Sequence, residues 1–351
     1  MTSLKRYLKE LNDLVAVSGE EDEVADYIKR ELENTSLLKT EDSLGNLIYI
    51  KKGQNARISL LLAAHMDEIG FIVTYIDNDG FVYFGPIGDH DDRMAINQVL
   101  QIKTQKGIVK GVTGTKPAHV LTSSDIQKAI MMKDIFLDVG TSSKKETENL
   151  GVEIGDYITF DREGQFLNDG PIFTGKAVDN RSGCAILIEV MKRIEQLDIQ
   201  PTVYGSATVQ EETGIRGAAP VGYTVQPTIA LAIDVTLAGG LPGHEKQELP
   251  VYLGKGAAIK FYDEGISVPK KLSRKLVETA KKYNIPYQRE VLLKGATDAR
   301  AISVSGNGVI TGAISIPSKY IHSGVGCVHI EDIENVVELI VRFIEEFTEN
   351  L

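Results

Sequence analysis

Four apolar runs in the sequence each end in acidic or histidine residues, which are common metal ligands. The runs, with the residues that follow them, are 58–64 with His65 and Asp67, 202–209 with Glu211 and Glu212, 228–233 with Asp234, and 309–316 with His322. Each run has the length and composition of a buried strand. In open α/β sheets, ligands bind beyond the carboxyl ends of the strands. We therefore expect these side chains to converge on one pocket.

A fifth segment places Asp179 just before a predicted helix over residues 180–197. An aspartate in this position is typical of a helix N-cap, where its carboxylate accepts a hydrogen bond from the first turn. Beside the other acidic and histidine residues, however, a metal-binding role explains more of the pattern. We therefore interpret Asp179 as a metal ligand.

The predicted set combines two imidazoles with several carboxylates and contains no thiolate, which suits zinc, cobalt or manganese. Carboxylates crowded into one crevice repel each other unless cations neutralise them. Two divalent ions about 3.5–4 Å apart, sharing one carboxylate, would do this and would lower the pKa of a water between them from about 15.7 toward about 7. The set therefore predicts metal-dependent hydrolysis.

Such a reaction also needs a general base and a well-oriented histidine. The base takes the proton of the attacking water and passes it to the leaving amine. The neighbours Glu211 and Glu212 can divide the roles of base and ligand. Asp67 stands two residues after His65, from where it can orient that imidazole through its second nitrogen.

The segments around these motifs have the hydrophobic pattern of an α/β domain. Apolar residues recur at helical spacing in 4–15 and 184–197, and a closing amphipathic helix is expected over 333–347. Ser18 and Glu21 have the spacing of a capping box, which predicts that they start a second helix.

Between residues 70 and 164 the pattern changes to short alternating segments separated by Gly, Asp and Asn. The pair Asp79-Gly80 is typical of a tight hairpin. Closely spaced strands with such turns indicate a small β-barrel or sandwich inserted into the α/β domain. We therefore predict a discontinuous catalytic domain, residues 1–69 plus 165–351, and an inserted β-rich domain, residues 70–164.

Composition excludes some classes of partner. The chain of 351 residues has 49 acidic and 38 basic residues and a formal net charge of -11 at pH 7. Nucleic acids and anionic membranes bind to basic faces, so neither is expected as a main partner. Cys184 and Cys327 lie in apolar runs without a CxxC spacing, which indicates two reduced, buried thiols. Because no secretory signal and no membrane-spanning run is present, we expect a cytoplasmic protein.

Five ordered motifs resemble those of the tetrahedral, or TET-type, dinuclear metallo-aminopeptidases of metallopeptidase family 42, which include glutamyl and deblocking aminopeptidases. The motifs are His65-Met66-Asp67-Glu68-Ile69-Gly70-Phe71, Asp179-Asn180-Arg181-Ser182-Gly183, Gln210-Glu211-Glu212-Thr213-Gly214-Ile215-Arg216-Gly217-Ala218, Asp234-Val235-Thr236 and Tyr320-Ile321-His322-Ser323. The resemblance runs along essentially the whole chain, including residues 111–119 of the insertion. Any one motif is a weak signal, but five in order are a strong one.

The resemblance implies a catalytic domain with a mixed sheet of the zinc-exopeptidase type and a PDZ-like β-barrel inserted as a dimerisation domain. It also implies two divalent metal ions per subunit, with zinc or cobalt as the expected metals. Carried over to this sequence, the ligands are His65, Asp179 and Asp234 for one ion and Asp179, Glu212 and His322 for the other.

The same resemblance implies the remaining roles. Glu211 would be the general base, and Asp67 would be the partner of His65. A cis peptide bond is expected between Asp179 and Asn180, although such a bond without proline costs about 3–4 kcal/mol. The expected substrates are peptides, which lose their amino-terminal residue. The expected assembly consists of dimers that build a hollow tetrahedral homododecamer.

The residues leave other functions open. Some family members carry the name endoglucanase M, and a glycosidase would need two carboxylates but no metal. Against it, His65 and His322 would serve no purpose, and tryptophan, frequent in sugar-binding clefts, is absent. A metal-dependent N-acyl amino acid deacylase uses closely related chemistry, and a non-catalytic assembly could keep the fold. Arg300 could favour acidic substrates if it reached the pocket, although a surface position is the simpler interpretation.

Overall fold

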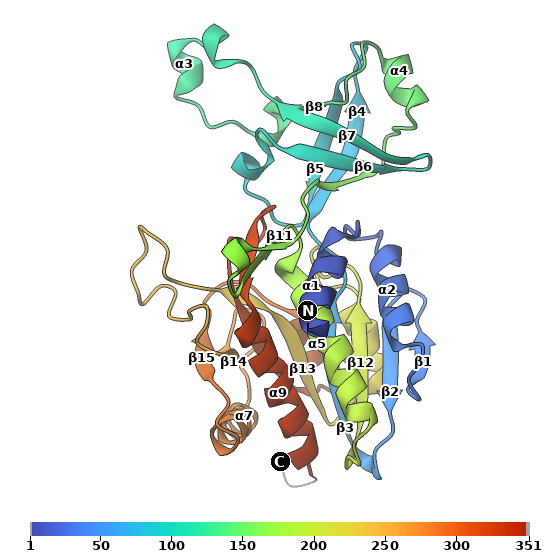
Figure 1. Ribbon diagram of the computed structural model, residues 1–351, viewed down its shortest axis with the longest axis vertical. Helices are drawn as coiled ribbons and strands as arrows, with labels where there is room; N and C mark the ends of the chain where they lie inside the picture. Colours follow the sequence, from blue (N-terminus) through green and yellow to red (C-terminus); the bar gives the residue numbers. More distant parts are fainter. Residues whose placement is uncertain (1, 349–351) are drawn as a thin grey trace.

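Two structural units make up the chain (Figure 1). The computed structural model describes residues 2–348. A large mixed sheet with helices on both faces forms one unit, and a small barrel stands beyond one end of that sheet. The barrel is inserted between β3 (Asn55–His65) and β10 (Gln165–Phe166). The predicted fold class, a mixed-sheet α/β domain with an inserted β-barrel, is therefore confirmed.

The large sheet has 11 strands. Besides β3 and β10 they are β1 (Leu38–Glu41), β2 (Leu47–Lys51), β11 (Ile172–Gly175), β12 (Pro201–Thr208), β13 (Ile229–Leu237), β14 (Ala257–Tyr262), β15 (Tyr287–Val291), β16 (Ile310–Lys319) and β17 (Gly326–His329). The main order is β1-β2-β12-β3-β13-β16-β17-β11-β10, and β14 pairs with β15 and β16. The central strands β12, β3, β13 and β16 are mutually parallel. Their carboxyl ends therefore lie side by side, at the end of the sheet from which the chain enters the barrel.

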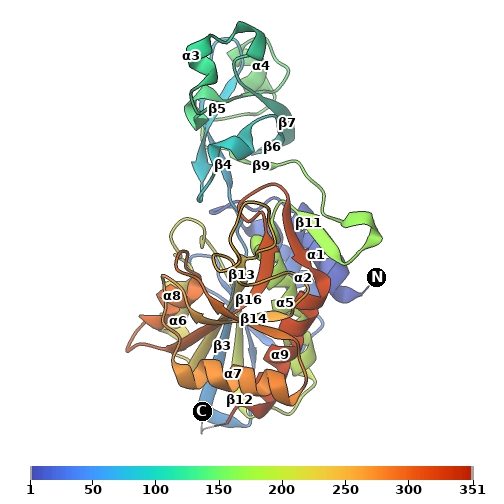
Figure 2. The same cartoon turned by 90° about the vertical axis from the view of Figure 1, so that its left-hand side faces the viewer.

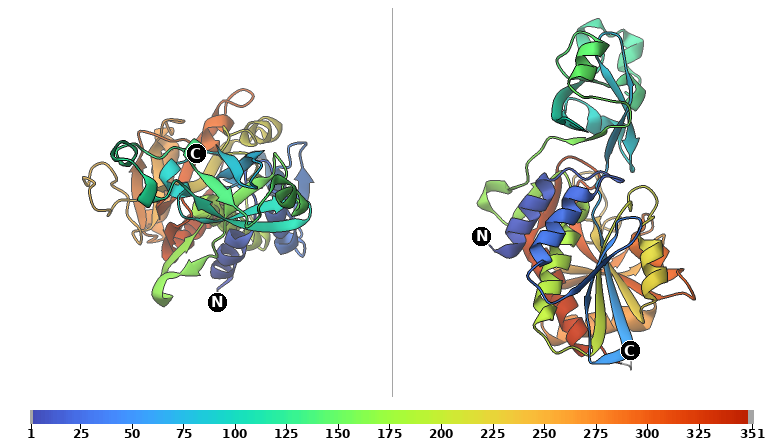
Figure 3. Two further views of the ribbon diagram at one scale, coloured as in Figure 1. Left: turned by 90° about the horizontal axis from the view of Figure 1, so that it is seen from above. Right: turned by 90° about the vertical axis from the view of Figure 1, so that its right-hand side faces the viewer.

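Helices cover both faces of the sheet (Figure 3). Those of the α/β unit are α1 (Ser3–Asp13), α2 (Asp22–Leu32), α5 (Val178–Glu195), α6 (Ala218–Val225), α7 (Lys270–Lys282), α8 (Asp298–Ser303) and α9 (Ile330–Glu346). One face carries α1, α2, α5 and α9, and the other carries α6 and α8. No helix within residues 2–348 is long and apolar enough to cross a membrane.

Side chains of β3 explain why the sheet is covered on both faces. Leu60 and Leu62 belong to the core beneath α5, whereas Leu61 and Ala63 belong to the core beneath α6 and α8. Successive residues of a strand point to opposite faces. A central strand buried on both faces must therefore be continuously apolar, which is the pattern from which this strand was predicted.

Six antiparallel strands close the barrel in the order β4-β5-β8-β7-β6-β9. They are β4 (Gly70–Ile76), β5 (Val82–Ile87), β6 (Val99–Thr104), β7 (Gly107–Gly114), β8 (Phe136–Asp138) and β9 (Tyr157–Phe160), and the short helices α3 (Ser123–Ile126) and α4 (Lys144–Asn149) flank them. Phe71, Leu100 and Ile158 belong to a core separate from that of the sheet. Figure 2 shows the barrel joined to the sheet by narrow connections. The predicted hairpin is present between β4 and β5, where Gly80 has φ +96°.

The helices predicted over 4–15, 180–197 and 333–347 correspond to α1, α5 and α9. Several short strands were not predicted from the sequence, namely β1, β8, β10, β11, β14, β15 and β17. Each has six residues or fewer. A segment this short contains too few alternations to mark it as a strand, so its pairing depends on the neighbours that the fold brings beside it.

Candidate metal centre

The parallel strands bring the predicted site residues to one end of the sheet. His65 is the last residue of β3 and pairs with Thr208, the last residue of β12. Glu211 and Glu212 come three and four residues after the end of β12 and therefore lie near His65. Asp234 lies in β13, and His322 follows the end of the parallel strand β16.

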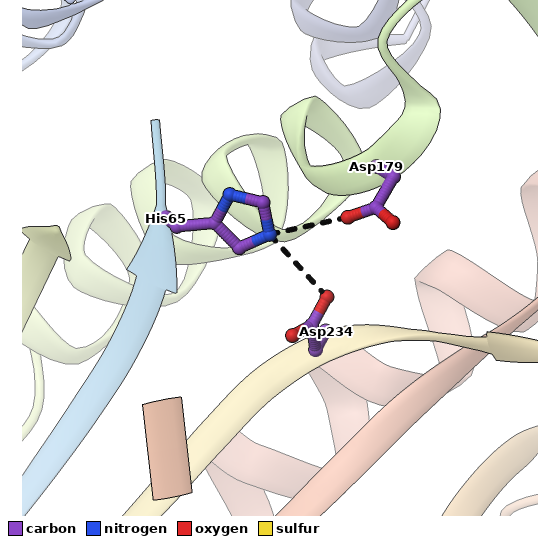
Figure 4. Close-up of side chains that lie close together, drawn as sticks. All are labelled: His65, Asp179 and Asp234. Carbon is purple, nitrogen blue, oxygen red and sulfur yellow. Dashed lines mark hydrogen bonds and ion pairs between the residues drawn. The ribbon is translucent and has the colours of Figure 1, made fainter. Parts of the chain in front are cut away.

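The predicted metal ligands form two groups that share Asp179. One group consists of His65, Asp179 and Asp234, and the other of Asp179, Glu212 and His322; in each, the ligand atoms all lie within 4.8 Å of one another. Figure 4 shows the imidazole of His65 directed toward the carboxylates of Asp179 and Asp234. Oδ1 of Asp179 is 3.1 Å from Nε2 of His65, and its Oδ2 is 3.4 Å from Nε2 of His322. The carboxylate of Asp179 thus presents one oxygen to each group, as a bridging ligand must.

The start of α5 presents Asp179 through an irregular backbone. Asp179 (φ −86°, ψ 107°) and Asn180 (φ −122°, ψ 43°) are not helical, and the peptide bond between them is cis, as predicted. The carboxylate of Asp179 faces His65 and His322, and it accepts no hydrogen bond from a described backbone N–H group of α5. The alternative interpretation of Asp179 as an N-cap therefore does not fit the structure.

Asn180 anchors this irregular segment to the sheet. Its Oδ1 accepts a hydrogen bond from the backbone N–H of Gly183 at 2.9 Å, and its Nδ2 donates to the carbonyl oxygen of Ile233 at 2.8 Å. Ile233 directly precedes Asp234 in β13. The side chain of Asn180 thereby fixes the spacing between two of the candidate ligands.

Asp67 is fully buried beneath the two groups. Its Oδ1 lies 3.3 Å from Nδ1 of His65, which leaves Nε2 of that ring directed at Asp179. The same carboxylate accepts hydrogen bonds from the backbone N–H groups of Glu211 (3.0 Å) and Glu212 (3.1 Å). One buried carboxylate therefore contacts both a candidate ligand and the backbone that carries two acidic side chains of the site.

The amino-terminal segment supports the site, and the predicted capping box is wrong. No side chain caps α2, whose N-cap residue is Glu21. The hydroxyl of Ser18 instead donates a hydrogen bond to Oδ2 of Asp67. Oε1 of Glu21 accepts hydrogen bonds from the backbone N–H groups of Gly19 (2.8 Å) and Gln210 (3.1 Å). Both side chains thus take partners that sequence spacing does not reveal, and Glu21 helps to hold Gln210 at a φ of +53°.

Crowding of the acidic groups governs their protonation. Burial, assisted by the charge of Asp179, raises the pKa of Glu212 to about 8. Burial also raises the pKa of Asp234, and that of Glu211 to well above its usual value. The pKa of His322 would be lowered by burial, but the hydrogen bond to Asp179 and the charge of Glu212 raise it to about 10. The charge of Asp89 acts in the same direction.

The pKa values of Asp179 and His65 are shifted in opposite directions. Burial would raise the pKa of Asp179, but its hydrogen bonds with His322 and His65 hold that pKa well below the usual range. Burial would lower the pKa of His65, but hydrogen bonds with Asp179, Asp234 and Asp67 raise it well above the usual value. The site therefore requires positive charge, which protons supply when no cation does.

The residues fit a pair of divalent metal ions. Imidazole nitrogens and carboxylate oxygens are suitable ligands for several first-row metals. Oε1 of Glu212 is buried and forms no hydrogen bond with any residue in 2–348. An unpartnered buried oxygen is unfavourable, and a coordinated cation would satisfy it.

Both groups line a cleft of about 500 Å³. Glu211 also lines the cleft but belongs to neither ligand group, so its carboxylate is available for other chemistry. Asp89 of the barrel, Lys260 of β14 and Lys294 of the loop after β15 complete the charged lining. Arg300 is exposed and does not line the cleft, which agrees with the simpler interpretation of this residue.

Sequence reasoning missed two buried charged residues beside the cleft. Burial raises the pKa of Asp298 to about 7, and its Oδ2 accepts a hydrogen bond from the hydroxyl of Thr208 at 2.5 Å. The ammonium group of Lys260 lies 3.0 Å from Oε1 of Glu290 and 3.1 Å from Oδ2 of Asp263. Asp298 follows no apolar run, and Lys260 follows only the three apolar residues 257–259, which are too few to mark it in the sequence.

A third missed residue, Glu68, connects the sheet to the barrel. Its carboxylate accepts hydrogen bonds from Lys176 at 2.6 Å and from the hydroxyl of Thr159 in β9 at 3.1 Å, and it pairs with Arg181 at 3.3 Å. All four side chains are buried. Glu68 lies in the same sequence motif as His65, and this position could have indicated that it supports the site.

Known proteins share this fold and are about one-third identical in sequence. The crystal structure of the TET aminopeptidase from the marine sediment archaeon Thaumarchaeota archaeon SCGC AB-539-E09 is 34% identical, covers 99% of this chain and 97% of that chain, and gives a TM-score of 0.96. The TET1 peptidase of Pyrococcus horikoshii, described as able to assemble into a tetrahedron or a large octahedral shell, is 32% identical, covers 98% of this chain and 100% of that chain, and gives a TM-score of 0.89. The glutamyl aminopeptidase of Lactococcus lactis subsp. cremoris (strain MG1363) is 30% identical, over 93% of this chain and 91% of that protein.

The sequence model of the family described as M42 glutamyl aminopeptidase matches residues 45–339, which is most of the chain. This match agrees with the candidate metal groups at the carboxyl ends of the strands and with the similarity of the whole fold. The chain belongs to the M42, or TET, aminopeptidase family and is a metallo-aminopeptidase, a hydrolase.

Proposed function

We propose that this chain removes the amino-terminal residue of peptides with two divalent ions, zinc or cobalt, bound in each subunit. The ligands of the ions would be His65, Asp179 and Asp234 for one and Asp179, Glu212 and His322 for the other. The observation that carries the proposal is the placement of Asp179. Its two oxygens face the two histidines separately, at 3.1 Å and 3.4 Å.

The residues of the chain divide the chemistry. When bound, the ions would neutralise the carboxylates, polarise the scissile carbonyl and provide water of lowered pKa. Glu211 would take the proton of the attacking water and deliver it to the leaving amine. Burial raises the pKa of Glu211, which suits a group that must both accept and donate a proton near neutral pH. Asp67 would hold the imidazole of His65 and the backbone of Glu211 in fixed positions relative to each other.

We further propose that residues 70–164 form a dimerisation domain and that dimers build a tetrahedral dodecamer. The tetrahedron described for the TET1 peptidase of Pyrococcus horikoshii supports this assembly. Apolar side chains on the barrel also support it, because Val112, Val120, Ile126 and Met131 are between 49% and 69% exposed. Exposed apolar residues of this kind are frequent in protein–protein interfaces. Light scattering after size exclusion tests the assembly, and a stable monomer would oppose it.

The catalytic proposal is tested by restoring activity to metal-free protein. The protein is stripped with a chelator, supplied with zinc, cobalt or manganese, and assayed on a panel of aminoacyl p-nitroanilides. N-acetylated p-nitroanilides, N-acyl amino acids and a soluble cellulose derivative are assayed in parallel. We expect metal-dependent cleavage of the unblocked substrates alone. Cleavage of the cellulose derivative alone, unaffected by EDTA, would indicate the glycosidase, and cleavage of N-acyl amino acids alone would indicate the deacylase.

A further inference from the structure

The inserted barrel contributes one acidic side chain to the cleft. Asp89 lies in the loop that follows β5, whereas the other acidic residues of the lining come from the α/β unit. The cleft is therefore built from both structural units, at the junction seen between them in Figure 2.

Packing on both sides holds the loop that carries Asp89. Nε2 of His90 donates to the carbonyl oxygens of Gly70 (2.7 Å) and Ile87 (3.0 Å), and its ring stacks on Phe71 with centroids 4.6 Å apart. The loop is thereby fastened to β4 and to the end of β5. The backbone at Asp89 is thus held beside the cleft by the next residue in the sequence.

The residue before Asp89 packs directly against the α/β unit. Gly88 has φ +83°, and a Cβ at this position would lie 2.7 Å from Cγ2 of Ile69 and 3.5 Å from Cβ of Glu212. Only glycine combines this backbone conformation with so close an approach. Asp89 is therefore held on the side of the cleft where Glu212 and His322 lie.

The charge of Asp89 is not balanced by the proposed metal ligands. Asp89 belongs to neither ligand group, its side chain is exposed, and it forms no hydrogen bond or ion pair with any residue between 2 and 348. Two divalent cations would balance the four carboxylates of Asp179, Glu211, Glu212 and Asp234. Of the two lysines in the lining, Lys260 is paired with Glu290 and Asp263, and the exposed Lys294 forms no ion pair with Asp89. The negative charge of Asp89 would therefore remain available to attract a cationic group of the substrate.

One part of the cleft lining is buried. Thr236, Lys260 and Thr297 are only 2%, 2% and 3% exposed, whereas Leu237, Lys294 and Gly295 of the same lining are exposed. An aminopeptidase must enclose the first residue of its substrate and leave an exit for the rest of the peptide. The buried part suits the amino-terminal side chain, so the remainder of the peptide would leave along the exposed part, to which Asp89 belongs.

We propose that Asp89 is a specificity-determining residue that favours a lysine or arginine side chain immediately after the scissile bond. This proposal rests on the aminopeptidase function proposed above. It assigns to the barrel a part in substrate selection, in addition to any part in assembly.

The test compares kcat/KM of the wild type and of Asp89→Asn on three tripeptides. The peptides share their first and third residues and carry Lys, Ala or Glu in second position. The p-nitroanilide of the same first residue serves as a substrate without any side chain after the scissile bond. We expect Asp89→Asn to lower the ratio of kcat/KM for the Lys peptide to that for the Glu peptide by about three- to tenfold, as expected for one partly exposed charge pair. Any change in kcat/KM for the p-nitroanilide measures the part of the effect that does not depend on that side chain, and it should be smaller than the change for the Lys peptide.

Two further variants test the charge dependence and serve as a control. Asp89→Lys should reverse the preference and favour the Glu peptide. Glu153→Gln removes one charge from an exposed residue of the barrel that does not line the cleft, and it should leave the ratio unchanged. An unchanged ratio in Asp89→Asn overturns the proposal. An equal loss on all substrates, the p-nitroanilide included, also overturns it, because Asp89 would then bind the amino group that every substrate shares. In either case an active wild type leaves the aminopeptidase function standing.

Discussion

The hydroxyl of Ser18 donates a hydrogen bond to Oδ2 of Asp67, across 49 residues of sequence and within the buried interior. The same carboxylate reaches Nδ1 of His65 and the backbone of Glu211 and Glu212. Ser18 therefore constrains the group on which both a candidate ligand and the candidate base depend. An amino-terminal loop that contributes no atom to the cleft lining still bears on the geometry of the site.

Replacement of Ser18 by Ala should weaken both stability and turnover. Loss of a hydrogen bond to a buried carboxylate should lower the free energy of unfolding by about 1–3 kcal/mol. A less constrained Asp67 should lower kcat by about three- to tenfold, since ligand and base lose part of their orientation. Chemical denaturation and steady-state kinetics measure the two effects. Ser206→Ala is the matched control, because Ser206 is buried in β12 and its hydroxyl has no partner among the described residues. If both variants behaved alike, the hydrogen bond of Ser18 would have no special role.

The Glu211→Gln variant should retain the metal ions and lose most of its catalytic activity. The amide has nearly the same shape as the carboxylate but cannot accept the proton, so kcat should fall by at least about 10²-fold. Glu211 belongs to neither ligand group, so metal content should stay at the wild-type value. Elemental analysis of the purified variant, alongside its kinetics, checks both statements. Turnover close to that of the wild type would remove Glu211 from the role of base.

Asp179→Ala should lose both ions, because each candidate group includes this carboxylate. If Asp179 bound only one of the two ions, the other ion would stay bound in the Asp179→Ala variant. Metal content after dialysis against a weak chelator distinguishes these cases, and Glu153→Gln provides an acidic substitution outside the site. Retention of two tightly bound ions in Asp179→Ala would contradict the bridging assignment.

Stability of the metal-free protein should fall as the pH rises. The pKa of Glu212 is raised from 4.5 to about 8, so its contribution to stability is complete below about pH 4.5 and is lost as the pH rises to about 8. The pKa of His322 is raised from 6.5 to about 10, so its contribution is lost between these values. The lowered pKa of Asp179 has the opposite sign, but its contribution is lost only on acidification below its usual value of 3.8.

Calorimetry at pH 6, 7.5 and 9, with and without a chelator, tests this pH dependence. Bound cations replace the protons that the crowded carboxylates otherwise need, so the metal-loaded protein should lose less stability. The difference in Tm between the two forms should therefore widen with pH. A metal-free protein that became more stable between pH 6 and pH 9 would contradict the shifts of Glu212 and His322.

Local sequence patterns were enough to identify the strands of the central sheet and the candidate ligands that follow them. A strand such as β3, buried on both faces, must be apolar throughout, so the position at which it ends can be read locally. His65, Glu212 and Asp234 lie at or near such ends. Because the parallel strands of an α/β sheet end at the same edge, these residues are expected to meet there, without knowledge of any single contact.

The placement of the two oxygens of Asp179, and the identity of the residues that support the site, depend on tertiary contacts. Ser18 and Glu21 have the spacing of a helix cap, yet each is held by a partner from another segment, and the one that joins Glu21 to Gln210 spans 189 residues. A side chain of this kind can satisfy its hydrogen bonds in several ways, and local spacing does not rank them. Asp89 is likewise an ordinary loop residue until the barrel docks and brings Gly88 against Glu212. Such contacts depend on the relative placement of whole elements, which no short stretch of sequence encodes.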